Sequence, residues 1–282
     1  MTHPKRRHLF LAFAALMFTC LVPAQADEQM DAISKRGRLK VAVYNNFPPY
    51  SDAGKGIDVD LGQALAAKLG LQAEIIGFMA GEDMSDDLRN MVWKGHYLNG
   101  DPADVMMRVP VDPVFAAAND KARIFSPYQQ EVMGMARSAK RIPAPSGSAA
   151  IALEVFTREK IGVEGDTLAD SFLGSVLHGR LRSNVVHFRS VKEAAKALRE
   201  DSISAIMAPI GELESALAGD TRFVIDEAKL GELSPKSWPI GMAVKADADD
   251  LAAALAGALA ELQKDGTVAA IFERHGVTLH TR

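Results

Sequence analysis

The sequence predicts an α/β protein in which strands and helices alternate along two successive series. Short runs of β-type residues alternate with segments whose apolar residues recur at helical spacing. An extended segment at 132–136 and a proline-rich stretch at 142–148 separate the two series. Hydrophobic residues make up 48% of the 282 residues, which is enough for a sizeable core and excludes a disordered chain.

The first series begins with a strand-like run that stops where Pro48 and Pro49 prevent a strand or helix from continuing. Asp58 and Asp60 stand at the start of the helix that follows, where their charges complement its dipole. The elements expected in this series are a strand at 39–43, a helix at 61–69, a strand at 73–78, a helix capped by Ser85 with its buried face at 88–92, and a strand at 105–107.

The second series has the same alternation and ends in two helices. Ser190 and Glu193 have the spacing of a capping box, and Gly266 and Gly276 stand where the last two helices end. The elements expected here are strands at 160–163, 185–188, 203–207, 223–225 and 240–244, and helices after Thr167, after Ser190, at 251–262 and at 268–272.

This alternation indicates mostly parallel sheets covered by helices. In such folds, ligands bind beyond the carboxyl ends of the strands. Here those ends are the segments 45–50, 108–112, 165–167 and 208–209. We therefore expect a binding site where these four segments meet.

The first 26 residues have the features of a cleavable signal peptide. Three basic residues at 5–7 precede an apolar run at 9–22, which is too short to span a bilayer comfortably. Ala24 and Ala26 give the small-x-small pattern, which predicts cleavage before Asp27 and a periplasmic mature protein. Cys20, the only cysteine, lies inside this segment, so the mature chain has no thiol and no disulfide.

Charge and motifs exclude several classes of function. Removing the three basic residues of the signal leaves 29 basic and 36 acidic residues, a charge of −7 instead of −4, which disfavours nucleic-acid binding. The sequence contains no HExxH, GxSxG, Walker or GxGxxG motif, and its histidines lack metal-ligand spacing. We therefore expect no catalytic residues, no metal and no cofactor.

Several short segments together resemble the type 2 periplasmic solute-binding proteins that serve amino-acid ABC transporters, the bacterial extracellular solute-binding family 3. The resemblance extends over roughly residues 38 to 277. The matching segments, in the family's order, are 39–41 with 47–50, 56–61, 103–105, 125–128, 162–167 and 259–272.

The resemblance implies a fold of two lobes, each a helix-covered and mostly parallel sheet, joined by two hinge strands that let the lobes close like a clam shell. It assigns residues 38–131 and 239–278 to lobe 1 and residues 137–237 to lobe 2. It also implies that the protein is a monomer, captures a small solute between the lobes and presents it to an inner-membrane ABC permease.

The sequence departs from the family's amino-acid clamp in both lobes. The family holds the ligand carboxylate with an arginine, whose planar fork meets both oxygens. Counting from the neighbouring motifs places that position at Ala116 or Asn119. The lobe 2 aspartate that takes the ligand ammonium is replaced by Pro209. We therefore expect a solute other than a standard α-amino acid.

Six residues are candidates for ligand contacts, each with an alternative role. Arg108 can supply a cation or lie at the surface near the hinge, and Thr167 can donate to an anion or simply cap a helix. Three aromatic residues can form apolar walls or ordinary packing between the lobes. The candidates are Phe47, Tyr50, Phe78, Arg108, Asp112 and Thr167.

Two other functions remain open. Residues 104–110 resemble a segment of the periplasmic proteins associated with quinoprotein methanol and alcohol dehydrogenases, which would make a PQQ-dependent dehydrogenase the partner. The usual cysteine of that subgroup is absent. Cyclohexadienyl dehydratases share the two-lobed fold, but their chemistry requires cations that hold two substrate carboxylates.

Overall fold

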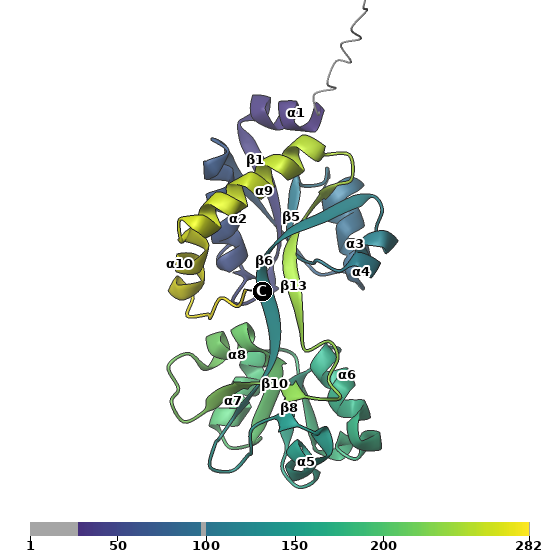
Figure 1. Cartoon of the computed structure of the whole chain (residues 1–282), viewed down its shortest axis with the longest axis vertical. Coiled ribbons are helices and arrows are strands. Elements are labelled where there is room, and N and C mark those ends of the chain that lie inside the picture. Colours follow the sequence, from purple (N-terminus) through teal and green to yellow (C-terminus); the bar gives the residue numbers. More distant parts are fainter. Residues whose placement is uncertain (1–27, 97–99, 282) are drawn as a thin grey trace, which may run out of the picture.

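The computed structural model describes residues 28–96 and 100–281, so the expected signal peptide lies outside the described residues. Two lobes are connected by the long strands β6 (Ala122–Arg137) and β13 (Ser237–Lys245), as Figure 1 shows. Among the described residues, no helix is long and apolar enough to cross a membrane. The two-lobed α/β fold expected from the sequence is confirmed.

In the sheet of lobe 1, β1 (Arg38–Tyr44) pairs in parallel with both of its neighbours, β4 (Gln72–Phe78) and β5 (Val105–Pro110). The strand order is β4, β1, β5, β13 and β6, with β13 antiparallel to both of its neighbours. The other elements of this lobe are α1 (Glu28–Arg36), β2 (Asn46–Phe47), β3 (Ser51–Asp52), α2 (Ile57–Lys68), α3 (Met84–Leu88), the π-helical turn η1 (Arg89–Trp93), α4 (Pro113–Ala118), α9 (Asp249–Lys264) and α10 (Thr267–Arg274).

The sheet of lobe 2 continues from the far end of β6. Its order is β6, β10 (Ala205–Pro209), β8 (Ile161–Glu164) and β9 (Val185–Phe188), and β11 (Val224–Glu227) also pairs with β6. The remaining elements are β7 (Ser146–Gly147), α5 (Ala149–Ala152), η2 (Glu154–Thr157), α6 (Leu168–Ser175), η3 (Val176–Gly179), η4 (Arg182–Asn184), α7 (Val191–Arg199), α8 (Ile210–Leu217) and β12 (Lys229–Leu230).

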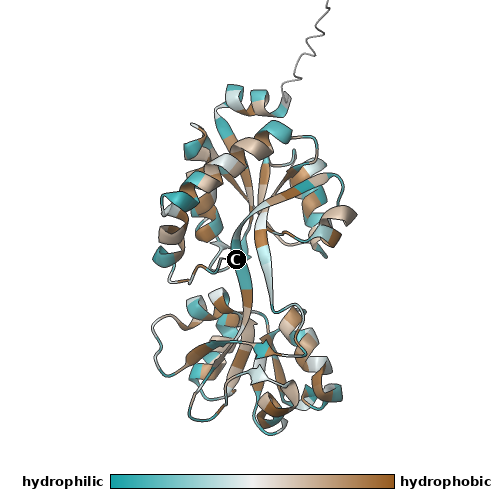
Figure 2. Ribbon diagram, viewed as in Figure 1, coloured by the Kyte–Doolittle hydropathy of each residue, from teal (hydrophilic) through white to brown (hydrophobic). Residues whose placement is uncertain are grey.

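Each sheet buries both of its faces, which explains why its strands are almost continuously apolar. In β5, for example, Met107 packs in the cluster beneath α2 and α9, whereas Met106 packs against α3 and η1 on the other face. Lobe 2 has a corresponding pair of clusters on the two faces of its sheet. Figure 2 shows the apolar residues concentrated along the strands and on the inner faces of the helices.

Several local expectations need correction. Asp83, rather than Ser85, caps α3, because its carboxylate accepts a hydrogen bond from the backbone N–H of Asp86. The segment 132–136 is only part of the 16-residue strand β6. Pro209 ends strand β10 instead of lying in a turn beyond it. The two strand differences arise because strand length is set by the pairing of β6 with β13 and β10, which local patterns do not report.

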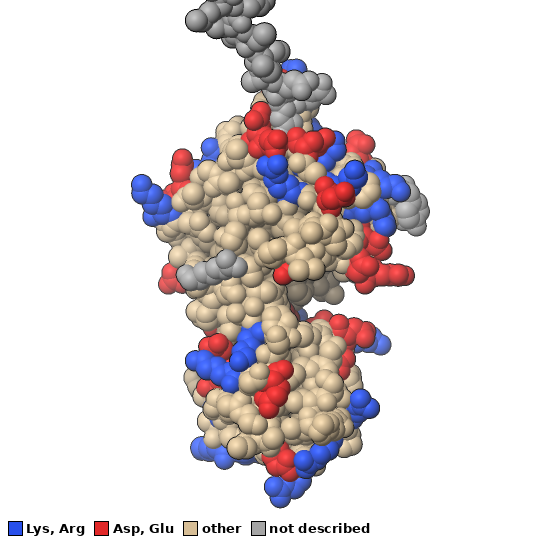
Figure 3. Space-filling model, turned by 45° about the vertical axis from the view of Figure 1, so that its right-hand side comes forward, with Lys and Arg blue, Asp and Glu red and all other residues tan. Residues whose placement is uncertain are grey.

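The surface carries both signs of charge. On the face drawn in Figure 3, acidic and basic side chains are interspersed over both lobes. This mixture on the visible face gives no basic stripe of the kind that follows a nucleic-acid backbone.

Candidate functional site

A cavity of about 460 Å³ lies between the two lobes, at the carboxyl ends of the parallel strands. Lobe 1 contributes the loops after β1 and β4 and the end of β5, and lobe 2 contributes the ends of β8 and β10 and the first turns of α6, α7 and α8. The crossing strands contribute Glu131, Met133, Trp238 and Ile240. The four strand-end segments named from the sequence all supply residues to this cavity.

Aromatic and thioether side chains form much of the cavity wall. The ring centroids of Tyr44 and Phe78 are 4.6 Å apart, and those of Tyr44 and Phe47 are 5.9 Å apart with an edge-on orientation. The other large apolar residues of the wall are Trp238, Ile240, Met79, Met84, Met133 and Met207. Such a surface suits an organic ligand that has an apolar body.

Arg108 enters the cavity because β5 contains a bulge. Along β13, residues 241 and 243 pair with Val109 and Met106, so β5 has one extra residue in this interval. Arg108 adopts a left-handed backbone conformation with φ of 63°, which is uncommon for a residue other than glycine. A bulge of this kind redirects a side chain and is frequent beside functional sites.

The guanidinium of Arg108 is buried and paired within the protein. Arg108 Nη2 forms an ion pair with Glu131 Oε2, and the two side chains are only 3% and 5% exposed. The guanidinium carbon lies 3.1 Å from the ring centroid of Tyr50 and 4.8 Å from that of Phe47. The negative charge of Glu131 raises the pKa of Arg108 above its ordinary value, against the opposing effect of burial. Glu131 therefore neutralises the only cationic side chain among the described residues of the cavity wall.

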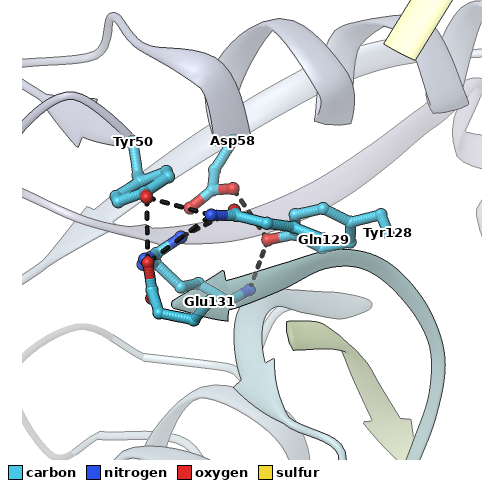
Figure 4. A network of polar contacts seen from close by, with 6 residues as sticks. Tyr50, Asp58, Tyr128, Gln129 and Glu131 are labelled. Atoms are coloured by element: carbon cyan, nitrogen blue, oxygen red, sulfur yellow. Dashed lines mark hydrogen bonds and ion pairs between the residues drawn. The ribbon is translucent and has the colours of Figure 1, made fainter. Parts of the chain in front are cut away.

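Two tyrosine hydroxyls connect this ion pair to the rest of lobe 1, as Figure 4 shows. Tyr50 donates to Glu131 Oε1 at 2.9 Å and accepts from Gln129 Nε2 at 3.0 Å. Tyr128 donates to Asp58 Oδ1 at 2.7 Å and accepts from the backbone N–H of Arg108 at 3.1 Å. The hydrogen bonds of these hydroxyls to Glu131 and to the Arg108 backbone fix the position of the ion pair.

Asp58 belongs to this network, although the sequence suggested only that it complements the dipole at the start of its helix. It is 1% exposed, and burial raises its pKa to about 6, partly opposed by the charge of Arg108. Asp60, in contrast, accepts from Arg274 and contacts His275 at the surface. The two carboxylates point in different directions because residues two apart lie on different sides of a helix.

Two further carboxylates line the cavity from lobe 2. Glu212, in the first turn of α8, is 9% exposed and makes no hydrogen bond or ion pair with any described residue. Burial raises the pKa of Glu212 well above its ordinary value, and the charge of Glu131 adds to this effect. Glu164 ends β8 and accepts from the backbone N–H of Val191 at 3.2 Å, and burial raises its pKa as well.

The six candidate ligand residues occupy different environments. Phe47, Phe78, Arg108 and Thr167 line the cavity. Tyr50 is completely buried beneath the Arg108 guanidinium. Asp112 lies outside the cavity lining, and its carboxylate caps α4 by accepting from Phe115 N–H at 2.7 Å. A ligand role for each of the six remains a prediction.

Thr167 caps a helix, which is one of the two roles considered for it, and also lines the cavity. Its hydroxyl accepts from Asp170 N–H at 3.3 Å and donates to the Glu164 carbonyl at 2.8 Å, so it caps α6 while lining the cavity. The capping bonds occupy the hydroxyl proton, which leaves it unable to donate to an anion.

Sequence reasoning missed the acidic residues of the cavity. Glu131 and Gln129 lie on β6, directly after the Phe-Ser-Pro-Tyr segment, and Glu212 lies three residues beyond Pro209. The available signal was a glutamate beside residues of an expected apolar core. Charged residues are rarely buried without a partner or a function, so such a position indicates a possible site.

Groups that could hold a metal ion are absent from the described part of the chain, where no set of three or more His, Cys, Asp or Glu residues comes together. The arrangement is therefore that of a binding site with an apolar lining and a few buried charges.

Solved structures resemble the chain over most of its length. An ancestral cationic amino acid solute-binding protein covers 88% of this chain and 99% of its own, with a TM-score of 0.68 and 19% identity. An amino acid ABC transporter substrate-binding protein from Streptococcus pneumoniae bound to L-arginine covers 89% and 99%, with a TM-score of 0.60 and 17% identity. A histidine kinase sensor domain with similarity to periplasmic binding proteins covers 86% and 98%, with a TM-score of 0.58 and 18% identity.

No protein-family model matches the chain, and no curated protein matches it. At identities below one fifth, the structural likeness establishes the fold and leaves the ligand undetermined. The chain has the two-lobed fold of the periplasmic solute-binding proteins.

Proposed function

We propose that the protein is a periplasmic solute-binding protein that captures a small organic molecule between its lobes and delivers it to an ABC-type importer of the inner membrane. The cavity between the lobes carries this proposal, because both lobes and both crossing strands supply its wall. Its volume of about 460 Å³ lies within the range typical of small-molecule sites. The amino-acid-binding proteins among the structural neighbours support the same role.

The two crossing strands suit capture by closure. β6 and β13 pair with each other from lobe 1 up to the crossing between the lobes, so small backbone changes in this ribbon can rotate one lobe relative to the other. A ligand that contacts both lobes binds the closed form more tightly and shifts the population towards it. An importer can then distinguish the loaded protein from the empty one.

The solute we propose differs from a standard α-amino acid. Ala116 lies in α4 and Asn119 ends that helix, so neither candidate position supplies a cation for a carboxylate. Pro209 offers no carboxylate for an ammonium group, and Arg108 is already paired with Glu131.

The alternatives have less support. The segment 104–110, which suggested a quinoprotein dehydrogenase as partner, forms strand β5 in the core of lobe 1. Its Asp104 carboxylate accepts from the backbone N–H of Lys40 at 2.7 Å, which is a structural role. A dehydratase would need cations for two carboxylates, whereas Arg108 is the one cationic side chain among the described lining residues.

The direct test is to purify the protein from the periplasm, denature it and identify the released small molecules by mass spectrometry. Adding the released compound back at a hundred times its Kd should stabilise the protein by about 2.7 kcal/mol. For a chain of this length, that raises the Tm by roughly 5–10 °C.

Phe47→Ala should weaken this binding, because it removes a cavity wall, and Phe115→Ala is the matched control. Both phenylalanines are half-buried in lobe 1, but Phe115 packs from α4 against an apolar cluster outside the cavity. Capture in this cavity would be disproved if no compound copurifies and no solute shifts the Tm, or if Phe47→Ala leaves binding unchanged.

A further inference from the structure

The charges that face the cavity do not balance. Glu131 cancels the charge of Arg108, and the described lining residues include no other lysine, arginine or histidine. The carboxylates of Glu164 and Glu212 also face the cavity, and neither forms an ion pair within the described part of the chain. The cavity therefore holds unpaired negative charge once these carboxylates ionise.

Glu212 is the less satisfied of the two. Glu164 accepts a backbone hydrogen bond, whereas Glu212 is nine-tenths buried, lines the cavity and has no hydrogen-bond partner. Buried carboxylates are normally paired or hydrogen-bonded, because burying an isolated charge is unfavourable. A buried, unpartnered carboxylate that lines the cavity suggests that the ligand supplies its partner.

The aromatic wall is also suited to a cation. Ring faces attract positive charge, and Arg108 already lies over the rings of Tyr50 and Phe47. Tyr44, Phe78 and Trp238 provide further rings around the same space. An organic cation can thus contact aromatic faces with its body and a carboxylate with its charged group.

The same geometry disfavours a ligand carboxylate. To bind one, Arg108 would have to leave Glu131 and its stacking position on Tyr50, which are both buried. It would leave behind an unpaired carboxylate, an arrangement that is strongly unfavourable in a protein interior.

We propose that the solute is an organic amine with an apolar body and no carboxylate, and that Glu212 is its counter-ion. This inference rests on the proposed function and specifies its substrate class.

The test compares amines with the amino acids from which they differ only by a carboxylate: tryptamine with tryptophan, tyramine with tyrosine, phenethylamine with phenylalanine, and agmatine with arginine. Thermal shift and titration calorimetry measure binding to the full mature chain. At least one amine should bind, and it should bind at least tenfold more tightly than its parent amino acid.

Glu212→Gln should weaken amine binding by about tenfold to a hundredfold, the usual range for losing a hydrogen bond to a charged group. Glu214→Gln is the matched control, because Glu214 lies on the same helix but points away from the cavity and accepts from Thr278. It should bind the amine as the unmodified protein does.

Amine binding should also release a proton. The charged groups that face Glu212 are Glu131, Glu164 and Arg108, and burial raises the pKa of Glu212 and so favours its protonated form in the empty cavity. Calorimetry in phosphate and in Tris buffer should therefore give different apparent enthalpies, and Glu212→Gln should remove the difference. A residue with a merely structural role would not change this buffer dependence.

The outcomes separate the two proposals. A tighter-binding amino acid or carboxylic acid, a copurifying neutral or anionic solute, or undiminished amine binding by Glu212→Gln would overturn the amine proposal while leaving solute capture intact. If no amine binds and no small molecule copurifies, both proposals are wrong.

Discussion

Arg108 and Glu131 place opposite charges in the cavity wall, with the Arg108 guanidinium over the rings of Tyr50 and Phe47. Removing two ions from water costs several kcal/mol for each ion, and attraction between them offsets this only when further groups satisfy the remaining donors and acceptors. Tyr50 and Gln129 meet that requirement by contacting Glu131 and each other. The pair therefore fixes the position of Arg108 and cancels its charge, and its contribution to stability is secondary.

Glu212 predicts a pH-dependent effect on stability. Its folded-state pKa lies above the unfolded value, so folding favours the protonated carboxyl, and stability falls as the pH rises above about 4.5 towards the folded pKa. Glu212→Gln removes this loss and should raise the Tm of the ligand-free protein at pH 7 to 8. Each kcal/mol gained corresponds to about 2–4 °C.

The Tm difference between Glu212→Gln and the unmodified protein should shrink as the pH is lowered to about 4.5 and below, because the carboxyl then becomes protonated in the unfolded state as well. Calorimetric scans over pH 4 to 8 measure this difference in Tm. A difference that stays constant with pH would show that Glu212 does not titrate in the way its burial implies.

Irregularities in two strands direct side chains into the site. β5 carries an extra residue at Arg108, and β6 carries two extra residues opposite β13 between Phe125 and Gln129. Ser126, within the second irregularity, has φ of 51°. These bulges break the alternation of side chains and bring Tyr128 against the backbone of Arg108.

Replacing glycine by alanine should have opposite effects on stability at Gly241, where two strands approach closely, and at Gly257, on an open helix surface. A Cβ on Gly241 in β13 would lie 2.4 Å from the carbonyl oxygen of Phe125, so Gly241→Ala must push the strands apart. It should cost about 1–3 kcal/mol. Gly257 in α9 has open space around it, so Gly257→Ala should stabilise the protein by up to about 1 kcal/mol.

Urea unfolding of the two variants measures both changes in the free energy of unfolding. Equal effects of the two alanines would mean that the contact between β13 and the bulged part of β6 does not restrict Gly241.

The whole molecule is organised around the ribbon of β6 and β13. The chain enters lobe 2 along β6, returns along β13, and adds α9 and α10 to lobe 1. The cavity is therefore lined by both lobes, and a zwitterion bound there would need a cation and a carboxylate from its wall.

Because the cation is already paired, free α-amino acids should bind poorly. Each missing charged partner removes roughly 1.5–3 kcal/mol. A thermal-shift screen of the common amino acids should therefore leave the Tm unchanged. A clear rise that Arg108→Ala abolishes would show that Arg108 leaves Glu131 to bind the ligand carboxylate, and would contradict this prediction.

Local patterns determined much of the fold. The runs at 39–43 and 73–78 became β1 and β4, and the apolar stripe at 251–262 became most of α9, because period and end signals act over a few residues. The strand-end loops also brought Phe47, Phe78, Arg108 and Thr167 to one cavity, since the carboxyl ends of parallel strands meet at one edge.

Tertiary structure decided which partners the charged residues of the cavity contact. Glu131 is 23 residues from Arg108, and Tyr128 is 70 residues from Asp58, so no local pattern could pair them. Their meeting depends on the bulges of β5 and β6, which are set by strand register. The sequence by itself identified Arg108 as a candidate ligand residue. Only the tertiary structure pairs Arg108 with Glu131 and leaves Glu212 facing the cavity without a partner, because these contacts join residues that are distant in the sequence.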